Sequence, residues 1–230
     1  MRMLEKELRQ GLTELALPLD DARIGLLLDY LELIQKWTKV YNLTAVRDPA
    51  EMLTHHLLDS LAVIAPLRAQ LAQLHAQPKV PGAASAEGGR AVIRLLDVGS
   101  GAGLPGVVIA ICCPDVLVDC VDTVAKKAAF IRQVAATLRL SNLQGLHARV
   151  ENLTEKYTVI CSRAFASLLD FTTWSSGALA EQGVWLAMKG KSPDEELAVL
   201  PAQVEVFHVE QLTVPGLDAE RCIIWMRVRT

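Results

Sequence analysis

A short glycine-rich segment constrains the fold of this chain more than any other stretch. The apolar run of residues 92–98 predicts a buried strand, which leads into Gly99, Gly101 and Gly103 and then into an apolar helix opened by Pro105. A strand, a glycine turn and a helix in this order form the nucleotide-binding corner of open α/β sheets. Glycine permits positive φ angles at such a turn and leaves no Cβ between the backbone and a ligand.

The register of the glycines indicates which ligand this corner suits. Gly101, Gly103 and Gly106 match G-x-G-x-x-G, the pattern of dinucleotide sites. That register leaves Asp97 and Gly99 without a role, and a carboxylate beside a pyrophosphate is unfavourable. An acid before G-x-G-x-G better suits a ligand with a cationic amino-acid end, such as S-adenosylmethionine. The segment therefore favours the methyl donor, with a glycine turn that binds no ligand as the alternative.

Strands and helices alternate after this segment. Strands are expected at 92–97, 116–121, 143–148, 157–162, 183–188, 204–213 and 221–228, and helices at 105–112, 124–139, 167–180 and 193–199. This alternation predicts an α/β fold with a doubly wound, mostly parallel sheet of seven strands. Only a turn at residues 215–218 separates the last two strands, so they form a C-terminal antiparallel hairpin. Dinucleotide domains lack that hairpin, whereas Rossmann-like class I S-adenosylmethionine-dependent methyltransferases possess it.

The residues before the sheet predict a helical subdomain. An amphipathic helix is expected at 3–16, a longer one capped by Asp20 or Asp21, and a third that starts at Asp48-Pro49. Proline, glycine, alanine and serine are frequent before the first strand, which indicates a flexible linker or loop. The expected organisation is an N-terminal helical subdomain at 1–74, a linker at 75–91 and a methyltransferase domain at 92–230.

Polar residues follow several of the predicted strands, at the sheet edge where open α/β folds bind ligands. Asp122 ends the second strand and could accept the hydroxyls of a ribose, or serve as a helix-start acid. Glu151 follows the third strand and could accept from an adenine amine, or be a surface acid. Arg163 and Lys189 end the fourth and fifth strands and point toward the same edge, although Lys189 could instead mark a strand that runs out into solvent. His56 falls on the apolar face of a helix, where a core or interface histidine is expected.

Composition excludes some classes of protein. The 230 residues are 51% hydrophobic with a net charge of −3, and neither a signal peptide nor a membrane span is expected. Five cysteines without a C-x-x-C pair predict small buried thiols in a reducing cytoplasm, with no metal site. Residues 126–150 hold five basic residues and no acid. Lys126, Lys127 and Arg132 in this stretch are either an RNA-binding footprint or a solvated helix face.

Six motifs occur in order along nearly the whole chain: Tyr41-Asn42-Leu43-Thr44-Ala45-Val46-Arg47-Asp48, His56-Leu57-Leu58-Asp59-Ser60, Asp97 to Gly106, Arg149-Val150-Glu151, Ser162-Arg163-Ala164-Phe165-Ala166-Ser167 and Lys189-Gly190. Together they resemble the RsmG (glucose-inhibited division protein B) family of bacterial 16S ribosomal RNA guanine-N7 methyltransferases. The glycine segment alone is typical of methyltransferases in general. Y-N-L-T with H-x-L-D-S upstream of it is specific to this family.

The resemblance implies transfer of a methyl group from S-adenosylmethionine to N7 of one guanine in 16S ribosomal RNA, either free or in the small subunit or an assembly intermediate. It carries the family's cofactor contacts to Gly99, Leu104, Val150, Glu151 and Arg163, with Asp122 at the ribose, and we expect Gly101 and Gly103 of the same loop to contribute. The chain departs from the family in a longer segment at about 74–90. It also has His55 where an arginine or lysine is usual.

Guanine N7 carries a lone pair and no proton, so neither a general base nor a metal is expected. The residues expected to position the guanine are Asn42, His56, Arg163 and Lys189. The protein is expected to be a cytoplasmic monomer that does not bind membranes. Three other functions stay open: a small-molecule methyltransferase, which the acidic net charge permits, a module that binds the cofactor or RNA without turnover, and, more distantly, a dehydrogenase, which nicotinamide binding would reveal.

Overall fold

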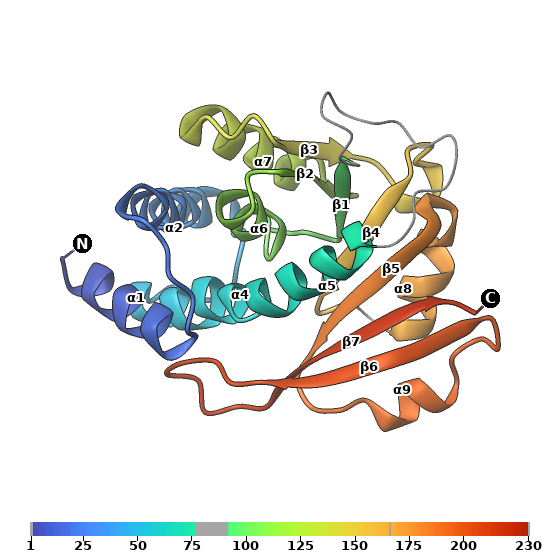
Figure 1. The fold of residues 1–230 in the computed structure, drawn as a ribbon. Coiled ribbons are helices and arrows are strands. Elements are labelled where there is room, and N and C mark those ends of the chain that lie inside the picture. Colours follow the sequence, from blue (N-terminus) through green and yellow to red (C-terminus); the bar gives the residue numbers. More distant parts are fainter. Residues whose placement is uncertain (1, 77–91, 166, 230) are drawn as a thin grey trace.

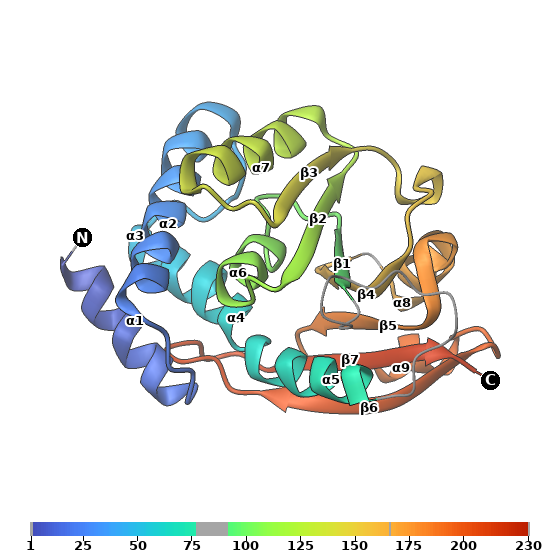
Figure 2. The ribbon, with the colours of Figure 1, turned by 45° about the horizontal axis from the view of Figure 1, so that its top comes forward.

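The computed structural model describes residues 2–76, 92–165 and 167–229, in which a twisted sheet lies between two layers of helices (Figures 1 and 2). The strands are β1 (Ile93–Val98), β2 (Val116–Asp122), β3 (Leu143–His147), β4 (Tyr157–Arg163), β5 (Leu179–Lys189), β6 (Val204–Leu212) and β7 (Arg221–Val228). Their order across the sheet is β3-β2-β1-β4-β5-β7-β6. The first five strands along the chain are parallel and β7 is antiparallel to both β5 and β6, which confirms the predicted seven-stranded sheet and its C-terminal hairpin.

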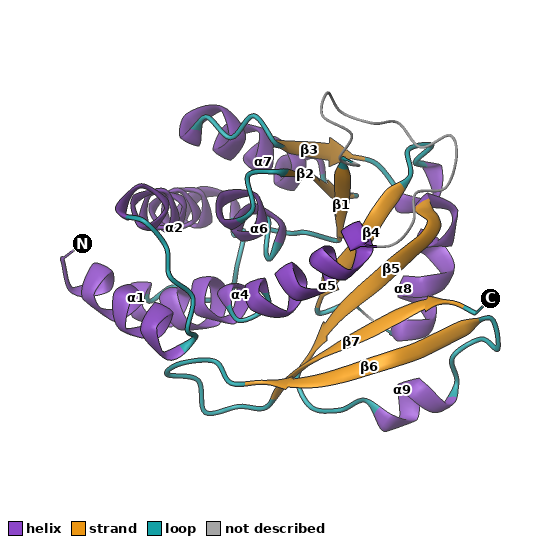
Figure 3. Cartoon of the chain, in the orientation of Figure 1, coloured by secondary structure: helices purple, strands orange, loops and turns teal. Residues whose placement is uncertain are grey.

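Helices cover both faces of the sheet (Figure 3). They are α1 (Arg2–Glu14), α2 (Asp21–Tyr41), α3 (Pro49–Met52), the π-helical turn η1 (Leu53–Leu58), α4 (Asp59–Leu61), α5 (Ile64–Ala76), α6 (Gly106–Cys112), α7 (Ala125–Leu138), the 3-10 turn η2 (Val150–Asn152), α8 (Leu168–Ser175), the 3-10 turn η3 (Ser176–Ala178) and α9 (Asp194–Ala198). Figure 2 shows α1, α2 and α6 to the left of the strands and α8 to the right. Successive residues of the central strands therefore serve two cores: Leu95 packs with the N-terminal helices, and Leu96 packs with α8.

The N-terminal helices begin where capping residues predict. The carboxylate of Asp20 accepts from the backbone N–H of Arg23, which identifies Asp20 as the cap of α2. Asp48 accepts from the N–H groups of Ala50 and Glu51, with Pro49 at the first helical position. The third helix is not continuous, because η1 and a two-residue turn after α4 divide it from α5.

Two expected boundaries are wrong. The helix expected at 167–180 ends at Ser175, and β5 begins at Leu179 instead of residue 183. The apolar residues after Ser175 fit a helical period, but Gly177 interrupts them and Leu179 pairs with Tyr157 of β4. Pro105, expected to open a helix, precedes α6 as its capping residue.

The N-terminal helices share one hydrophobic core with a face of the sheet. Leu27 of α2, Leu57 of η1 and Val107 of α6 are all fully buried in the same cluster. The boundaries predicted at 74 and 91 stay a prediction, and most of the linker expected at 75–91 lies outside the described residues. No helix in the described part of the chain is long and apolar enough to cross a membrane.

Candidate functional site

The carboxyl ends of the parallel strands bring most of the predicted site residues to one edge of the sheet. Val98 of β1 is paired with Val121 of β2, and Asp97 is paired with Cys161 of β4. The segments that follow these strands therefore start side by side, with the glycine loop in the middle. Sequence positions more than sixty residues apart become neighbours at this edge.

The glycine loop folds through three positive φ angles, of +68° at Gly99, +58° at Gly101 and +88° at Gly103. A Cβ at Gly101 would meet nothing closer than the carbonyl oxygen of Gly99 at 3.9 Å, so space lies open above this residue. A Cβ at Gly103 would instead lie 2.5 Å from side-chain atoms of Ile131 and Val107. The loop thus offers an open cradle at Gly101, whereas the glycine at 103 serves close packing against the core. Contact of Gly103 with a cofactor stays a prediction.

Asp97, in β1, fixes the start of α6 directly after the glycine loop. It is fully buried, and its Oδ2 accepts from the N–H of Gly106 at 2.9 Å, which ties the end of β1 to the start of α6. Burial raises the pKa of this carboxyl to about 7. Its Oδ1 is buried without a hydrogen-bond partner among the described residues, so one acceptor remains for a further donor.

Asp122 closes the loop from the side of β2. Its Oδ2 accepts from the N–H of Gly101 at 3.1 Å, and its Oδ1 accepts from Val124 N–H at 2.8 Å. The ammonium of Lys127 lies 3.4 Å from the same carboxylate. Asp122 therefore accepts a hydrogen bond from the residue that precedes α7 and also lies beside the glycine loop. Ribose binding by Asp122 stays a prediction.

The other predicted cofactor residues differ in exposure. Leu104 and Val150 are buried, and Val150 opens η2 directly after β3. Glu151 is exposed, and its nearest charged partner is Arg149 at 3.9 Å. Of these three, Glu151 has a polar side chain that remains accessible to a ligand.

Arg163 ends β4 and belongs to a charge cluster that the sequence did not predict. Its guanidinium donates to Asp59 Oδ2 at 2.8 Å and to the carbonyl of His55 at 2.9 Å. The second oxygen of Asp59 accepts from Arg221 at 2.7 Å. The Asp59 side chain is 4% exposed, so two guanidinium groups share one buried carboxylate.

A cavity of about 370 Å³ opens beside this cluster. It is lined by His55, His56, Asp59, Arg163, Ala164, Met188, Lys189, Gly190, Leu212, Arg221 and Cys222. Three of the four predicted positioning residues, His56, Arg163 and Lys189, are thereby brought together. The lining comes from the N-terminal helical segment, from β4 and β5, and from the C-terminal hairpin.

His56 is a buried histidine, as the apolar helix face predicts. It is 6% exposed, and its Nε2 lies 3.0 Å from the hydroxyl of Thr44. Burial and the charge of Arg163 lower its pKa from 6.5 to about 4. The side chain is therefore neutral throughout the neutral pH range.

Lys189 and Asn42 have different surroundings. The Lys189 ammonium lies 2.9 Å from both carboxylate oxygens of Glu196, so β5 ends in an ion pair with α9. Asn42 ends α2 in the left-handed conformation, with φ 51°, and its side-chain oxygen accepts from Arg47 at 2.5 Å. Asn42 is exposed and is not among the residues that line the cavity.

The predicted basic footprint on α7 is uneven. Lys126 is exposed, and Lys127 is partly buried beside Asp122. Arg132 is exposed but donates to the carbonyl of Gly145 at 3.1 Å. RNA contact by these residues stays a prediction.

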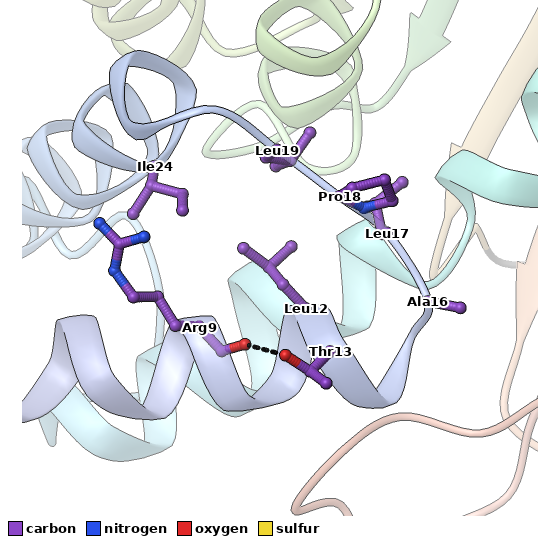
Figure 4. Close-up of a pocket in the computed structure, with 8 residues that line it drawn as sticks. All are labelled: Arg9, Leu12, Thr13, Ala16, Leu17, Pro18, Leu19 and Ile24. Atoms are coloured by element: carbon purple, nitrogen blue, oxygen red, sulfur yellow. Dashed lines mark hydrogen bonds between the residues drawn. The ribbon is translucent and has the colours of Figure 1, made fainter.

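A second cavity, of about 420 Å³, lies between α1 and the start of α2 (Figure 4). Apolar side chains such as Leu12, Leu17 and Ile24 form most of its wall, and Arg9 stands at its rim. It holds no predicted site residue. Within the described residues, no three histidine, cysteine, aspartate or glutamate side chains are grouped as a metal site would require. All five cysteines are free and buried, as expected.

Sequence reasoning missed three residues that organise the site. Asp59 and Arg221 complete the charge cluster, and the Tyr30 hydroxyl donates to the carbonyl of Ala102 at 2.6 Å in the glycine loop. Asp59 carries a recognisable signal, because an acid inside an apolar helical run needs a buried partner. Tyr30 and Arg221 carry none, since their partners lie 72 and 162 residues away.

The fold is shared with solved methyltransferase structures. Over 77% of this chain and 53% of the other, TrmN from Thermus thermophilus matches with a TM-score of 0.52 at 17% identity. A SAM-dependent methyltransferase from Aquifex aeolicus matches over 79% of this chain and 94% of the other, with a TM-score of 0.50 at 16% identity. At such identities the likeness concerns the fold alone.

Sequence comparison is more specific. The family model described as rRNA small subunit methyltransferase G matches residues 23–224. Ribosomal RNA small subunit methyltransferase G of Albidiferax ferrireducens is 72% identical over 99% of this chain and 98% of the relative's length. The protein of the same name from Polaromonas sp. is 66% identical over the whole of this chain and 96% of its own length. The chain therefore belongs to the rRNA small subunit methyltransferase G family, in agreement with its motifs and its class I methyltransferase fold.

Proposed function

We propose that this protein transfers a methyl group from S-adenosylmethionine to N7 of one guanine in 16S ribosomal RNA. The observation that carries the proposal is the 72% identity, over nearly the full chain, to a ribosomal RNA small subunit methyltransferase G. Its RNA partner is 16S ribosomal RNA, free or within the small subunit or an assembly intermediate. It acts in the cytoplasm, as a monomer, without a metal ion.

The glycine loop fits the cofactor. The open space above Gly101 admits a ligand against the backbone, and the orphaned Oδ1 of Asp97 can accept from a further donor. Gly99, Gly101, Leu104, Asp122, Val150, Glu151 and Arg163 would hold S-adenosylmethionine. When bound, it supplies an electrophilic methyl group: as guanine N7 bonds to the carbon, the carbon–sulfur bond breaks, its electron pair stays on sulfur, and the positive charge moves to the purine.

The side chains position the guanine and do not activate it. N7 has no proton to lose, and His56 is neutral, buried and hydrogen-bonded to Thr44. Holding two reacting atoms in line can lower the activation free energy by about 7–11 kcal/mol. Arg163 and Lys189 provide donors at the edge of the cavity, and their charges are compensated by Asp59 and Glu196. Asn42, at the end of α2, provides a further polar group for the RNA.

The test is methyl transfer from labelled S-adenosylmethionine to small-subunit RNA, free and in particles, followed by mapping of the labelled base. The expected result is one labelled guanine whose N7 carries the methyl group. A label on small molecules but not on RNA would identify a small-molecule methyltransferase instead. Binding of cofactor and RNA without any transfer would identify a module without turnover.

A further inference from the structure

Two aromatic side chains have no role in the function proposed so far: Phe165, beside the glycine loop, and Trp174, which packs edge-on against Phe165. Phe165 lies two residues beyond Arg163, in the segment that leads from β4 to α8. A Cβ at Gly99 would lie 3.7 Å from Cδ2 of the Phe165 ring. The ring therefore borders the space in front of the loop that is expected to hold the methyl donor.

Phe165 is part of an aromatic cluster with Phe171 and Trp174. Its centroid lies 5.6 Å from that of Phe171, which is buried, and 5.6 Å from that of Trp174, which meets it edge-on at 72°. Side chains of a helix lean toward its N-terminus, so Trp174 on α8 reaches back toward the carboxyl edge of the sheet. The side of Trp174 away from the core stays open, with 44% of the residue exposed. An accessible indole at this edge offers the kind of surface on which nucleobases stack.

Charged and polar groups around the aromatic cluster fix the segment that carries Phe165. The carboxylate of Glu196 accepts from the N–H of Leu168 at 2.6 Å and also pairs with Lys189. The Lys189 ammonium lies 3.4 Å from the carbonyl oxygen of Phe165 itself. The Ser167 hydroxyl caps α8 through the N–H of Asp170. Phe165 is thus anchored to β5, α8 and α9 before any ligand arrives, and this preorganisation favours a positioning role.

The charge that develops on the purine during methyl transfer indicates what this aromatic surface would bind. A guanine methylated at N7 is a cation, so positive charge builds on the purine during transfer. The nearby Arg163 and Lys189 are each paired with a carboxylate, which lessens their repulsion of that charge. An aromatic face attracts a positively charged ring more strongly than it attracts a neutral ring. A group that binds the transition state more tightly than the ground state accelerates the reaction.

We propose that Phe165, with Trp174 at its edge, is the stacking surface for the target purine, and that it binds the purine more strongly as the purine becomes positively charged. This inference rests on the proposed function and assigns that function a residue which positions the acceptor. It predicts that the electron density of the ring, and not merely its shape, affects the rate.

The test replaces Phe165 with phenylalanines of increasing fluorination, which nearly keep the shape but weaken the attraction of the ring for cations. The single-turnover rate of methyl transfer, at saturating RNA and cofactor, should fall stepwise by about 2- to 30-fold in total. The affinity for S-adenosylmethionine, measured by calorimetry, should stay unchanged. Leu117→Ala, an exposed apolar residue near the amino end of β2, is the control and should keep the wild-type rate.

A binding measurement without cofactor gives a second readout that does not depend on turnover. The full-length protein should bind 7-methylguanosine monophosphate more tightly than guanosine monophosphate, and Phe165→Leu should remove most of that preference. Trp174→Leu should reduce the preference less, because Trp174 supports the ring from its edge.

The outcomes separate the two proposals. If the wild-type protein labels no RNA, the proposed function fails, whatever the variants do. If the wild-type protein labels guanine N7 but the rate does not change with fluorination, the stacking proposal alone is overturned. A loss of S-adenosylmethionine affinity in Phe165→Leu, with an unchanged preference for the methylated nucleotide, would make Phe165 a cofactor contact and would also overturn it.

Discussion

The two sides of the carboxyl edge are built in different ways. Beside β1 and β2, carboxylates bind backbone N–H groups over short sequence separations: Asp97 reaches Gly106 across nine residues, and Asp122 reaches Gly101 across 21. One longer contact joins them, from the Tyr30 hydroxyl of α2 to the carbonyl of Ala102 across 72 residues. Beside β4, β5 and β7, the contacts join charged side chains, and Asp59 meets Arg163 and Arg221 across 104 and 162 residues. We call these the glycine side and the charged side.

The two sides therefore differ in how much of the chain must fold before each one exists. The glycine side is built mainly by the residues of one loop, with support from Asp122 and Tyr30, and the proposed cofactor would lie against the open backbone at Gly101. The charged side exists only when the N-terminal helices, the sheet and the C-terminal hairpin are all folded. Damage to the charged side should therefore lower the stability of the whole protein, whereas a side chain placed in the open space at Gly101 should mainly affect the proposed cofactor binding.

The largest effect is expected at Asp59. Asp59→Ala leaves the Arg163 and Arg221 guanidinium groups close together without the buried carboxylate that compensates them. Breaking a buried pair in this way typically costs about 3–5 kcal/mol. Urea denaturation should show that loss, and Glu32→Ala, which removes the exposed pair with Lys36, should cost less than about 0.5 kcal/mol. A loss below about 1 kcal/mol at Asp59 would show that the charged side does not hold the segments together.

The fold of the glycine side could be predicted from the sequence because most of its residues lie close together in the chain. Alternate glycines after an apolar strand specify both the turn and its place in the sheet, and the hairpin follows from the short turn near Pro215. The sequence identified Arg163 and Lys189 because they end strands. Asp59 signals that it needs a buried partner, but its pairing with Arg163, and that of Lys189 with Glu196, could not be predicted, since long-range pairing depends on how the helices pack. The end of α8 was misjudged because local periodicity does not reveal that Leu179 pairs with Tyr157 in the sheet.

The next effect concerns His56 and pH. The pKa of His56 is about 4 in the folded protein and near 6.5 when unfolded, so the unfolded chain binds the proton more strongly. The stability associated with neutral His56 is fully present above about pH 6.5 and is lost as the pH falls toward 4. The free energy of unfolding of the wild type, relative to that of His56→Gln, should therefore drop by about 3 kcal/mol between pH 7 and pH 4. Urea titrations at several pH values check this, and a difference that does not depend on pH would contradict it.

A smaller effect separates two glycines of one loop. Gly103→Ala places a Cβ against Ile131 and Val107 at a positive φ angle, which should destabilise the fold by about 1–3 kcal/mol. Gly101→Ala meets open space and should cost about 1 kcal/mol through its φ angle alone. It should nevertheless lower the affinity for S-adenosylmethionine at least about tenfold, because the Cβ fills the cradle. Calorimetry measures the affinity of both variants for S-adenosylmethionine, and denaturation measures their free energies of unfolding. An equal loss of affinity in the two variants would contradict the contrast.

The smallest effect is expected on α7, outside both sides of the edge. Lys126→Glu should weaken RNA binding and lower the slope of affinity against salt by about one unit, since each phosphate contact releases counterions. Lys127→Glu should in addition disturb cofactor binding, because its ammonium lies beside Asp122. Filter binding across salt concentrations measures the slope. An unchanged slope in Lys126→Glu would make this helix face a solvated surface.

Two RNA substrates that differ at one ring position of the target base decide whether N7 accepts the methyl group. The mapped guanosine is replaced by 7-deazaguanosine, which has a C–H group where guanine has N7. We expect labelled methyl transfer to the guanosine RNA and none to the 7-deazaguanosine RNA, with binding of both RNAs unchanged within about threefold, equivalent to roughly 0.7 kcal/mol. Undiminished transfer to the 7-deazaguanosine RNA would contradict N7 as the acceptor and, with it, a reaction that depends on positioning without a base.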